Sequence, residues 1–238
     1  MPGQPGLFRI VISDALRILT FRRPTPAIAQ HWPAYLAFGL FFTWLAGVGR
    51  YWDNPRADPW QYLGLGSVVY VFVLALLLWL MLWPLRPRNW SYRSILVFVT
   101  LTSPPAVLYA IPVEHFMSMR GAQLTNAWFL AIVATWRMAL LVWFLRVVGG
   151  LSRFAVAVAA LLPMTFIIVT LTILNLEHVV FNIMAGIQPE DPSQNDIAYE
   201  VVFFLSLWSV MLFPFLLLAY IGLVIHAWWW KPRKASQG

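Results

Sequence analysis

The sequence predicts an all-α protein that crosses a membrane several times, and three observations support this fold class. Hydrophobic residues make up 61% of the 238 positions and charged residues only 11%, whereas roughly a quarter of a typical soluble domain is charged. Uninterrupted apolar runs of about 20 residues recur along the chain, which is the length that a helix needs to cross a bilayer. The runs do not alternate apolar with polar residues, so they do not fit a membrane barrel.

Residues 1–31 precede the first of these runs and predict an amphipathic cytoplasmic segment. Apolar residues recur there at the spacing of one helix face, with charged residues between them. These apolar residues are Leu7, Phe8, Val11, Ile12, Ala15, Leu16 and Leu19. We expect a short helix that lies on the membrane surface and is ended by Arg22-Arg23-Pro24, because proline does not continue a helix. The alternative is a frayed basic tail.

Six apolar runs follow, and they predict a single transmembrane domain of six helices over residues 32–230. The approximate bounds of the runs are 32–49, 64–83, 94–113, 124–145, 154–176 and 201–228. The loops between them are too short for a separate soluble domain, which usually needs about 50 residues or more. Residues 231–238 form a basic tail with Lys231, Arg233 and Lys234.

Basic residues alternate between the loops and predict that both termini lie in the cytoplasm. The N-terminal segment, residues 86–93, residues 146–153 and the C-terminal tail are basic. The longest of the other loops, residues 177–200, contains no lysine or arginine. Cytoplasmic loops carry an excess of basic residues in membrane proteins. This pattern explains the net charge of +7 without a nucleic-acid partner.

Arg137 lies near the middle of the fourth predicted span, between Trp136 and Met138. An ionisable residue at that depth is costly, which makes it a candidate functional residue. In one interpretation Arg137 faces the bundle interior and contacts an anion or a lipid headgroup. In the other it clamps neighbouring helices, or its side chain extends toward the cytoplasmic side.

Two acidic-imidazole pairs, Glu114-His115 and Glu177-His178, end apolar runs on the predicted outer side. Carboxylate and imidazole groups bind divalent metals, so the four residues are a candidate metal site. However, adjacent residues of a helix point about 100° apart, and the spacing matches no known metal motif. The four histidines lie on different segments, which does not fit haem ligation. Ordinary interfacial polar residues explain the pairs more simply, and we predict no metal and no other cofactor.

Pro104 and Pro105 interrupt the third predicted span, and Pro112 follows near its end. Each proline removes a backbone hydrogen bond and leaves a carbonyl group free. Broken helices of this kind build binding sites in many transporters, but they also occur as simple packing kinks. Pro104 and Pro105 are therefore candidate functional residues, with a kink as the alternative.

The opening of the chain resembles that of bacterial Yip1-like inner-membrane proteins. The residues that carry the resemblance are Ser13-Asp14-Ala15-Leu16-Arg17-Ile18-Leu19, Phe21-Arg22-Arg23-Pro24 and Ile28-Ala29, and Thr102-Ser103-Pro104-Pro105 and Ile111-Pro112 are compatible with it. The chain departs from the family in having six predicted spans instead of five, and it lacks the Asp-Leu-Tyr-Gly-Pro motif of eukaryotic members. The resemblance implies a small non-enzymatic membrane protein, and it assigns no catalytic residues.

Three hypotheses for the function follow. The first is a non-enzymatic interaction or accessory subunit of the inner membrane, whose partners are the lipid bilayer and other membrane proteins or a second copy. The second is a small transporter or channel component, with Arg137 and the broken third span lining the path. The third is a membrane-embedded enzyme with a metal at the two Glu-His pairs.

Overall fold

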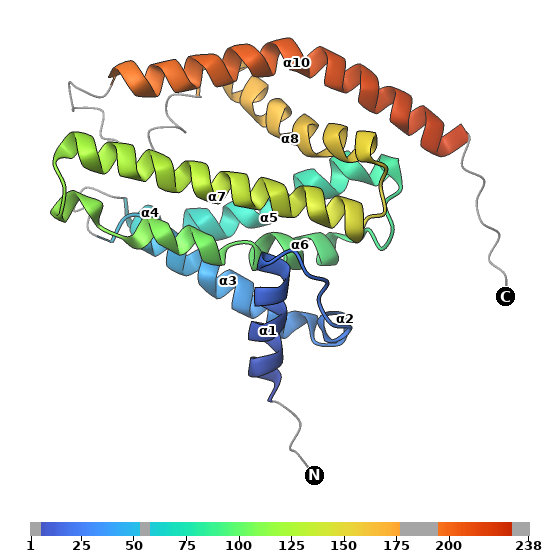
Figure 1. Ribbon diagram of the computed structural model, residues 1–238, viewed down its shortest axis with the longest axis horizontal. Coiled ribbons are helices and arrows are strands. Elements are labelled where there is room, and N and C mark those ends of the chain that lie inside the picture. The colour runs from blue at the N-terminus through green and yellow to red at the C-terminus, as the bar shows by residue number, and fades with distance from the viewer. Residues whose placement is uncertain (1–5, 53–57, 177–194, 230–238) are drawn as a thin grey trace. The chain divides into compact units, whose positions relative to one another are not determined.

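The computed structural model describes residues 6–52, 58–176 and 195–229, and every regular element among these residues is a helix (Figure 1). The predicted fold class, a helical membrane bundle, is therefore confirmed. The chain divides into two compact units. Unit 1 comprises Met1–Leu76 and Ser91–Trp143, and unit 2 comprises Leu77–Trp90 and Phe144–Gly238. The prediction of a single transmembrane domain stays a prediction.

Five of the described helices are long and apolar enough to cross a membrane. They are α3 (Trp32–Gly49), α5 (Leu65–Leu82), α7 (Met119–Val147), α8 (Arg153–Ile173) and α10 (Asn195–Trp229). A bent pair, α6 (Tyr92–Leu101) and the 3-10 helix η2 (Pro104–Ala110), whose axes differ by 43°, is apolar enough to make a sixth span if the two cross together, and otherwise forms a re-entrant loop. Five of the six predicted runs correspond to continuous helices, and the third corresponds to this bent pair, so that the structure has five or six spans.

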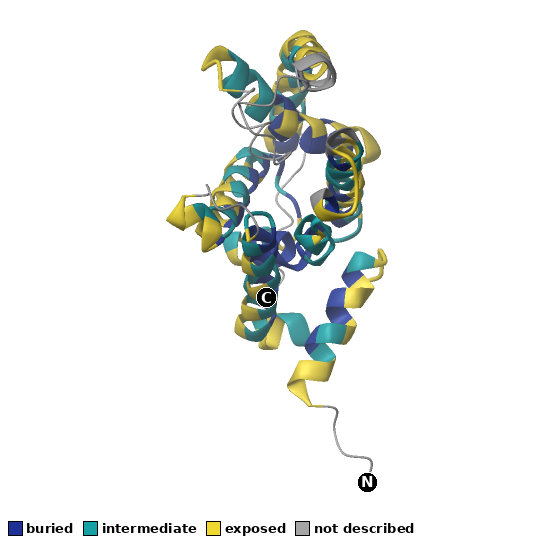
Figure 2. Cartoon of the chain, turned by 90° about the vertical axis from the view of Figure 1, so that its left-hand side faces the viewer, coloured by how far each residue is buried: buried dark blue, intermediate teal, exposed yellow. Residues whose placement is uncertain are grey.

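The N-terminal helix of unit 1, α1 (Leu7–Leu19), packs against α3 and α6. Its buried residues are Val11, Asp14, Ala15 and Ile18, so only part of the expected apolar face is free to meet a membrane. Figure 2 shows buried and exposed residues on different sides of this helix, above the N-terminus.

The end of α1 differs from the prediction, because the helix stops at Leu19 and not at Pro24. Phe21 adopts a left-handed conformation with φ of 59°. Its N–H donates to the Ile18 carbonyl at 2.9 Å, and the Arg22 N–H donates to the Arg17 carbonyl at 2.7 Å. This pair of bonds is the Schellman motif, which satisfies the last carbonyls of a helix and reverses the chain. The short helix α2 (Ala27–Gln30) then leads into α3.

The rest of unit 1 is organised around α3, which packs along both halves of the broken span. Small residues make this close approach feasible: a Cβ on Gly39 would lie 2.5 Å from the Thr100 hydroxyl oxygen. A similar conflict would arise between a Cβ on Gly49 and the Ala110 side chain. Two short elements, α4 (Pro59–Tyr62) and η3 (Val113–His115), complete the described part of this unit.

Unit 2 contains the antiparallel helices α8 and α10 and the 3-10 turn η1 (Trp83–Leu85). Ser152 caps the start of α8, accepting a hydrogen bond from the Ala155 N–H at 3.2 Å. The Tyr220 hydroxyl donates to the Met81 carbonyl at 2.6 Å, and the Trp228 indole donates to the Pro84 carbonyl at 3.0 Å. Side chains of α10 therefore satisfy the free carbonyls around the turn that ends α5.

Candidate functional site: two arginines beside the broken span

The break in the third span is stabilised by hydroxyl groups within unit 1. Pro104 and Pro105 begin η2, directly after the end of α6. The Thr102 hydroxyl donates to the Val99 carbonyl at 2.7 Å. The Thr100 hydroxyl donates to the Leu96 and Val97 carbonyls, each at 3.0 Å. These carbonyls lie just before the break; of the carbonyls that Pro104 and Pro105 leave without an i+4 donor, that of Thr100 accepts the Ser103 N–H at 3.0 Å.

A further hydroxyl pair ties the break to the neighbouring span. The Thr43 side chain of α3 bonds the Ser103 hydroxyl at 2.8 Å, and both residues are buried. Interhelical bonds of this kind are worth about 0.6 kcal/mol on average within a membrane. Together with the small residues of α3, this bond holds η2 in a defined position, so the residues of η2 are well placed to form a site.

Tyr109 of η2 lies beside a small hydrophobic cluster of Ala46, Ala106 and Val133, which come from α3, η2 and α7. Val133 is 1% exposed, so α7 is packed against the other two elements at this level. Arg137 follows Val133 by four residues, about one helical turn along α7. The cluster thereby brings the half-buried Arg137 and Tyr109 to the same part of unit 1.

Two arginines interact with Tyr109. The guanidinium of Arg50, which caps the end of α3, lies 4.6 Å from the centre of the Tyr109 ring. The charge of Arg137 also interacts electrostatically with the Tyr109 phenol. Arg50 and Arg137 are 87 positions apart in the chain, and only the packing of α3, η2 and α7 makes them neighbours of one tyrosine.

A second phenol lies beside Arg50. Burial raises the pKa of the Tyr51 hydroxyl, while the positive charge of Arg50 and a hydrogen bond from it act in the opposite direction. Arg50 is thus held between the ring of Tyr109 and the hydroxyl of Tyr51. Neither contact neutralises the guanidinium, because aromatic rings and phenols are uncharged at neutral pH.

Among the side chains that the structure describes, no carboxylate forms an ion pair with Arg50 or Arg137; the single ion pair there joins Arg17 and Asp14. An arginine keeps its charge even when it is desolvated, and its planar guanidinium matches carboxylate and phosphate groups. Two guanidinium groups in this part of unit 1 are therefore suited to bind an anion.

The structure describes only part of the two predicted Glu-His pairs. Glu114 and His115 lie on η3, and the His115 side chain is exposed. Glu177 and His178 fall outside the described residues, so the proposed meeting of the two pairs stays a prediction. Within the described part of the chain, no group of three or more His, Cys, Asp or Glu side chains could hold a metal ion.

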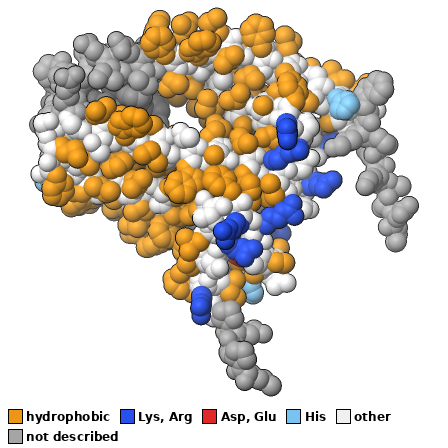
Figure 3. Space-filling model, in the orientation of Figure 1, with side chains coloured by type: hydrophobic (Ala, Val, Ile, Leu, Met, Phe, Trp, Pro, Cys, Tyr) orange, Lys and Arg blue, Asp and Glu red, His pale blue; other side chains and the backbone are white. Residues whose placement is uncertain are grey.

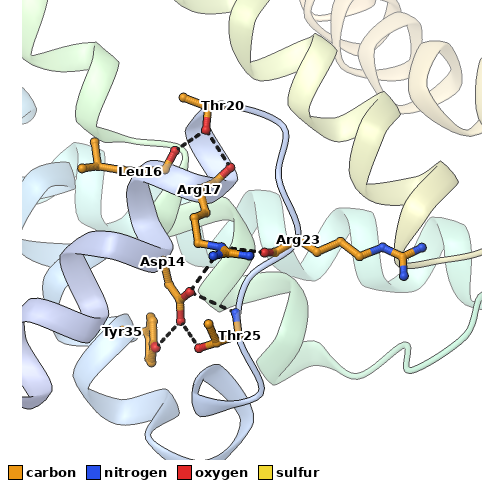
Figure 4. Close-up of polar contacts among 7 residues, drawn as sticks. All are labelled: Asp14, Leu16, Arg17, Thr20, Arg23, Thr25 and Tyr35. Carbon is orange, nitrogen blue, oxygen red and sulfur yellow. Dashed lines mark hydrogen bonds and ion pairs between the residues drawn. The ribbon is translucent and has the colours of Figure 1, made fainter. Parts of the chain in front are cut away.

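The most completely bonded polar group that the structure describes was not predicted as a site: Asp14 of α1 is fully buried (Figure 4). Its carboxylate accepts hydrogen bonds from the Thr25 N–H at 2.9 Å, the Thr25 hydroxyl at 2.6 Å and the Tyr35 hydroxyl at 2.7 Å. Arg17 lies 4.0 Å away and also donates to the Arg23 carbonyl at 3.0 Å. A sequence signal existed, since Asp14 interrupts the apolar face of α1.

Comparisons with known proteins add no relative. No protein-family model matches the chain, and neither curated proteins nor solved structures match it. The resemblance to Yip1-like proteins therefore stays a prediction, and any function has to be argued from the residues.

Proposed function

We propose that the protein is a small, non-enzymatic multi-pass membrane protein that binds an anionic group beside its broken third span, as a component of a transporter or channel. One observation carries the proposal: Arg50 and Arg137 both interact with Tyr109, and no carboxylate pairs with either among the described side chains. Broken spans with nearby ligand-binding groups are common in transporters.

The position of Arg137 supports a binding role. A charged residue within a transmembrane helix usually faces a partner or a water-filled path, because burial without one is costly. The nearby Tyr109 phenol carries no opposite charge at neutral pH. A phosphate or carboxylate group would supply it, and two guanidinium groups would bind such an anion more tightly than one.

The experiment is anion binding and transport by the full chain in proteoliposomes. We expect inorganic phosphate or acetate to raise the melting temperature of the wild type and to enter vesicles that contain it. Arg137→Gln removes both effects without lowering stability in the absence of anion. The control is Arg153→Gln, which removes an exposed arginine at the start of α8. If Arg137→Gln instead lowers stability without anion and leaves anion binding intact, the arginine is structural and the proposal is wrong.

A second proposal, a role as an interaction or accessory subunit, is favoured by α10. In the most apolar 18-residue stretch of α10, only 11% of the residues are buried, compared with 50% in that of α8. Its exposed side chains include Phe203, Trp208, Phe215 and Trp229. Lipid covers such a surface in a monomer, and another membrane protein or a second copy covers it in a complex. Native mass spectrometry in mild detergent tests this proposal, because a partner adds its mass to the chain.

We also propose a cellular location and an orientation in the membrane. The basic termini and the Yip1-like opening support an inner-membrane protein of a bacterium with both ends in the cytoplasm. Reporter proteins fused to the C-terminus test the orientation, since a reporter that is active only in the periplasm stays inactive on a cytoplasmic tail. An active periplasmic reporter would contradict the proposed topology.

A further inference from the structure

The helix α1 has two apolar sides, and only one of them packs against unit 1. Val11, Ala15 and Ile18 are at most 3% exposed. Phe8 and Leu16, in contrast, are 72% and 58% exposed. Eight residues turn a helix by about 80° more than two full turns, so Phe8 and Leu16 lie on the same half of α1. Phe8 and Leu16 therefore form a separate apolar strip beside the packed side.

The strip cannot be buried by rotation of the helix, because α1 is anchored at several points. Asp14 is bonded to Thr25 and Tyr35, as Figure 4 shows. The Trp136 indole of α7 donates to the Leu19 carbonyl at 3.0 Å, which holds the other end of the helix. Each contact uses the packed side or the last turn of α1, so Phe8 and Leu16 stay outside.

The surface around the strip is basic without interruption. Arg9, Arg17, Arg22 and Arg23 are all exposed. Asp14 is the single acidic residue between positions 6 and 52, and it is fully buried. Figure 3 shows basic side chains gathered near this part of the chain, with hydrophobic side chains beside them.

We propose that this strip and its arginines form a docking surface for anionic phospholipids, with Phe8 and Leu16 inserted below the headgroups of one leaflet. The charge of the surface selects this occupant. Basic residues beside exposed apolar residues on one helix are typical of segments that bind the interface of an anionic bilayer. Each arginine near such a surface strengthens binding by up to about fivefold. The surface lies on α1 and the turn that follows it, and it is independent of the anion site at Tyr109.

The chain contains no cysteine, so one introduced cysteine can be labelled at a single position. We would attach a bimane fluorophore to Leu16→Cys in the full chain and reconstitute it in phosphatidylcholine nanodiscs. Small, equal fractions of spin-labelled phosphatidylglycerol or spin-labelled phosphatidylcholine then quench the fluorophore. We expect severalfold stronger quenching by the anionic lipid. Val73→Cys is the control, because Val73 is an exposed apolar residue of α5 and should show equal quenching by the two lipids.

The arginines are tested by Arg22→Gln with Arg23→Gln in the Leu16→Cys chain. We expect the quenching ratio of the two lipids to fall toward one. Arg88→Gln with Arg153→Gln removes the same charge from exposed positions elsewhere and should leave the ratio unchanged. An equal ratio in the wild-type background would overturn the proposal. Quenching of position 16 by aqueous iodide, and not by lipid, would also overturn it. So would loss of quenching by both lipids if native mass spectrometry then showed the added mass of a second chain.

Discussion

Unit 1 contains two polar centres: the carboxylate of Asp14, and the pair Arg50 and Arg137 near Tyr109. They differ in how far groups of the chain meet their hydrogen-bonding and charge requirements. The carboxylate of Asp14 is fully buried and accepts three hydrogen bonds, all from neighbours in the chain. Arg50 and Arg137 are half-buried; Arg50 contacts the Tyr109 ring, the charge of Arg137 acts on the same residue, and neither forms an ion pair among the described side chains.

The difference separates structural charges from those suited to bind a ligand. A buried charge whose bonding capacity is filled by the protein holds one conformation, and removal of that charge leaves its donors without a partner. A buried charge without an opposite charge weakens the fold and attracts an anion. Substitution should therefore lower stability at Asp14 and lower anion binding at Arg137.

The largest expected effect on stability comes from Asp14→Ala. The substitution leaves the buried Tyr35 hydroxyl and both donor groups of Thr25 without their acceptor, which we expect to cost about 3 kcal/mol. Amide hydrogen exchange of the full chain in detergent should show loss of protection over residues 7–19, because the packed side of α1 is released. Ser13→Ala, at the exposed neighbouring position, should leave exchange unchanged. Unchanged protection in Asp14→Ala would show that apolar packing alone holds the helix.

The second effect tests the packing that positions both centres, since α3 carries Tyr35 and is followed directly by Arg50. Gly39→Ala places a Cβ 2.5 Å from the Thr100 hydroxyl oxygen and 2.8 Å from the Thr100 backbone carbon. Overpacking of this kind costs about 1–3 kcal/mol, which unfolding in mixed detergent micelles would measure. Gly222→Ala is the matched control, because a Cβ there would meet nothing within 4 Å. We expect no loss of stability in the control.

The spans could be predicted from the sequence because each depends on its own composition. The apolar runs 32–49, 64–83 and 154–176 correspond closely to α3, α5 and α8. The end of α1 could not be predicted in the same way. A Schellman motif at Phe21 requires a left-handed residue, and an aromatic residue at that position gives no signal for one.

The site could be predicted only in part, because it depends on which helices pack together. Arg137 stood out through its depth within a span, and Pro104 and Pro105 through their effect on a helix. Arg50 and Tyr109 are ordinary residues near the ends of their segments, and their relation to Arg137 appears only when α3, η2 and α7 are packed. Asp14 gives only a weak signal in the sequence, because a lone acid in an amphipathic segment usually faces water.

A third, smaller effect concerns the bond that supports η2. Thr43→Val keeps the shape of the side chain but removes the hydroxyl that bonds Ser103. We expect a loss of about 0.6 kcal/mol, the average for interhelical hydrogen bonds in membranes. The same unfolding measurement would detect it, with Thr170→Val as the control, because the Thr170 hydroxyl bonds only the Phe166 carbonyl of its own helix in the described contacts. A loss of stability as large as that of Asp14→Ala would contradict this expectation, and it would show that the bond between Thr43 and Ser103 is one of the main stabilising contacts of unit 1.

The smallest effect on stability should come from Arg137→Gln, even though Arg137 lies within a membrane span and Asp14 does not. Removing a charge that no described carboxylate balances also removes the cost of burying it, so the free energy of unfolding should not fall. Unfolding measured in an anion-poor buffer and again with phosphate separates the two kinds of centre. The wild type should gain stability with phosphate and Arg137→Gln should not, whereas Asp14→Ala should stay less stable under both conditions. A large loss in Arg137→Gln without phosphate would mean that the arginine is satisfied within the chain after all, and the contrast between the two centres would disappear.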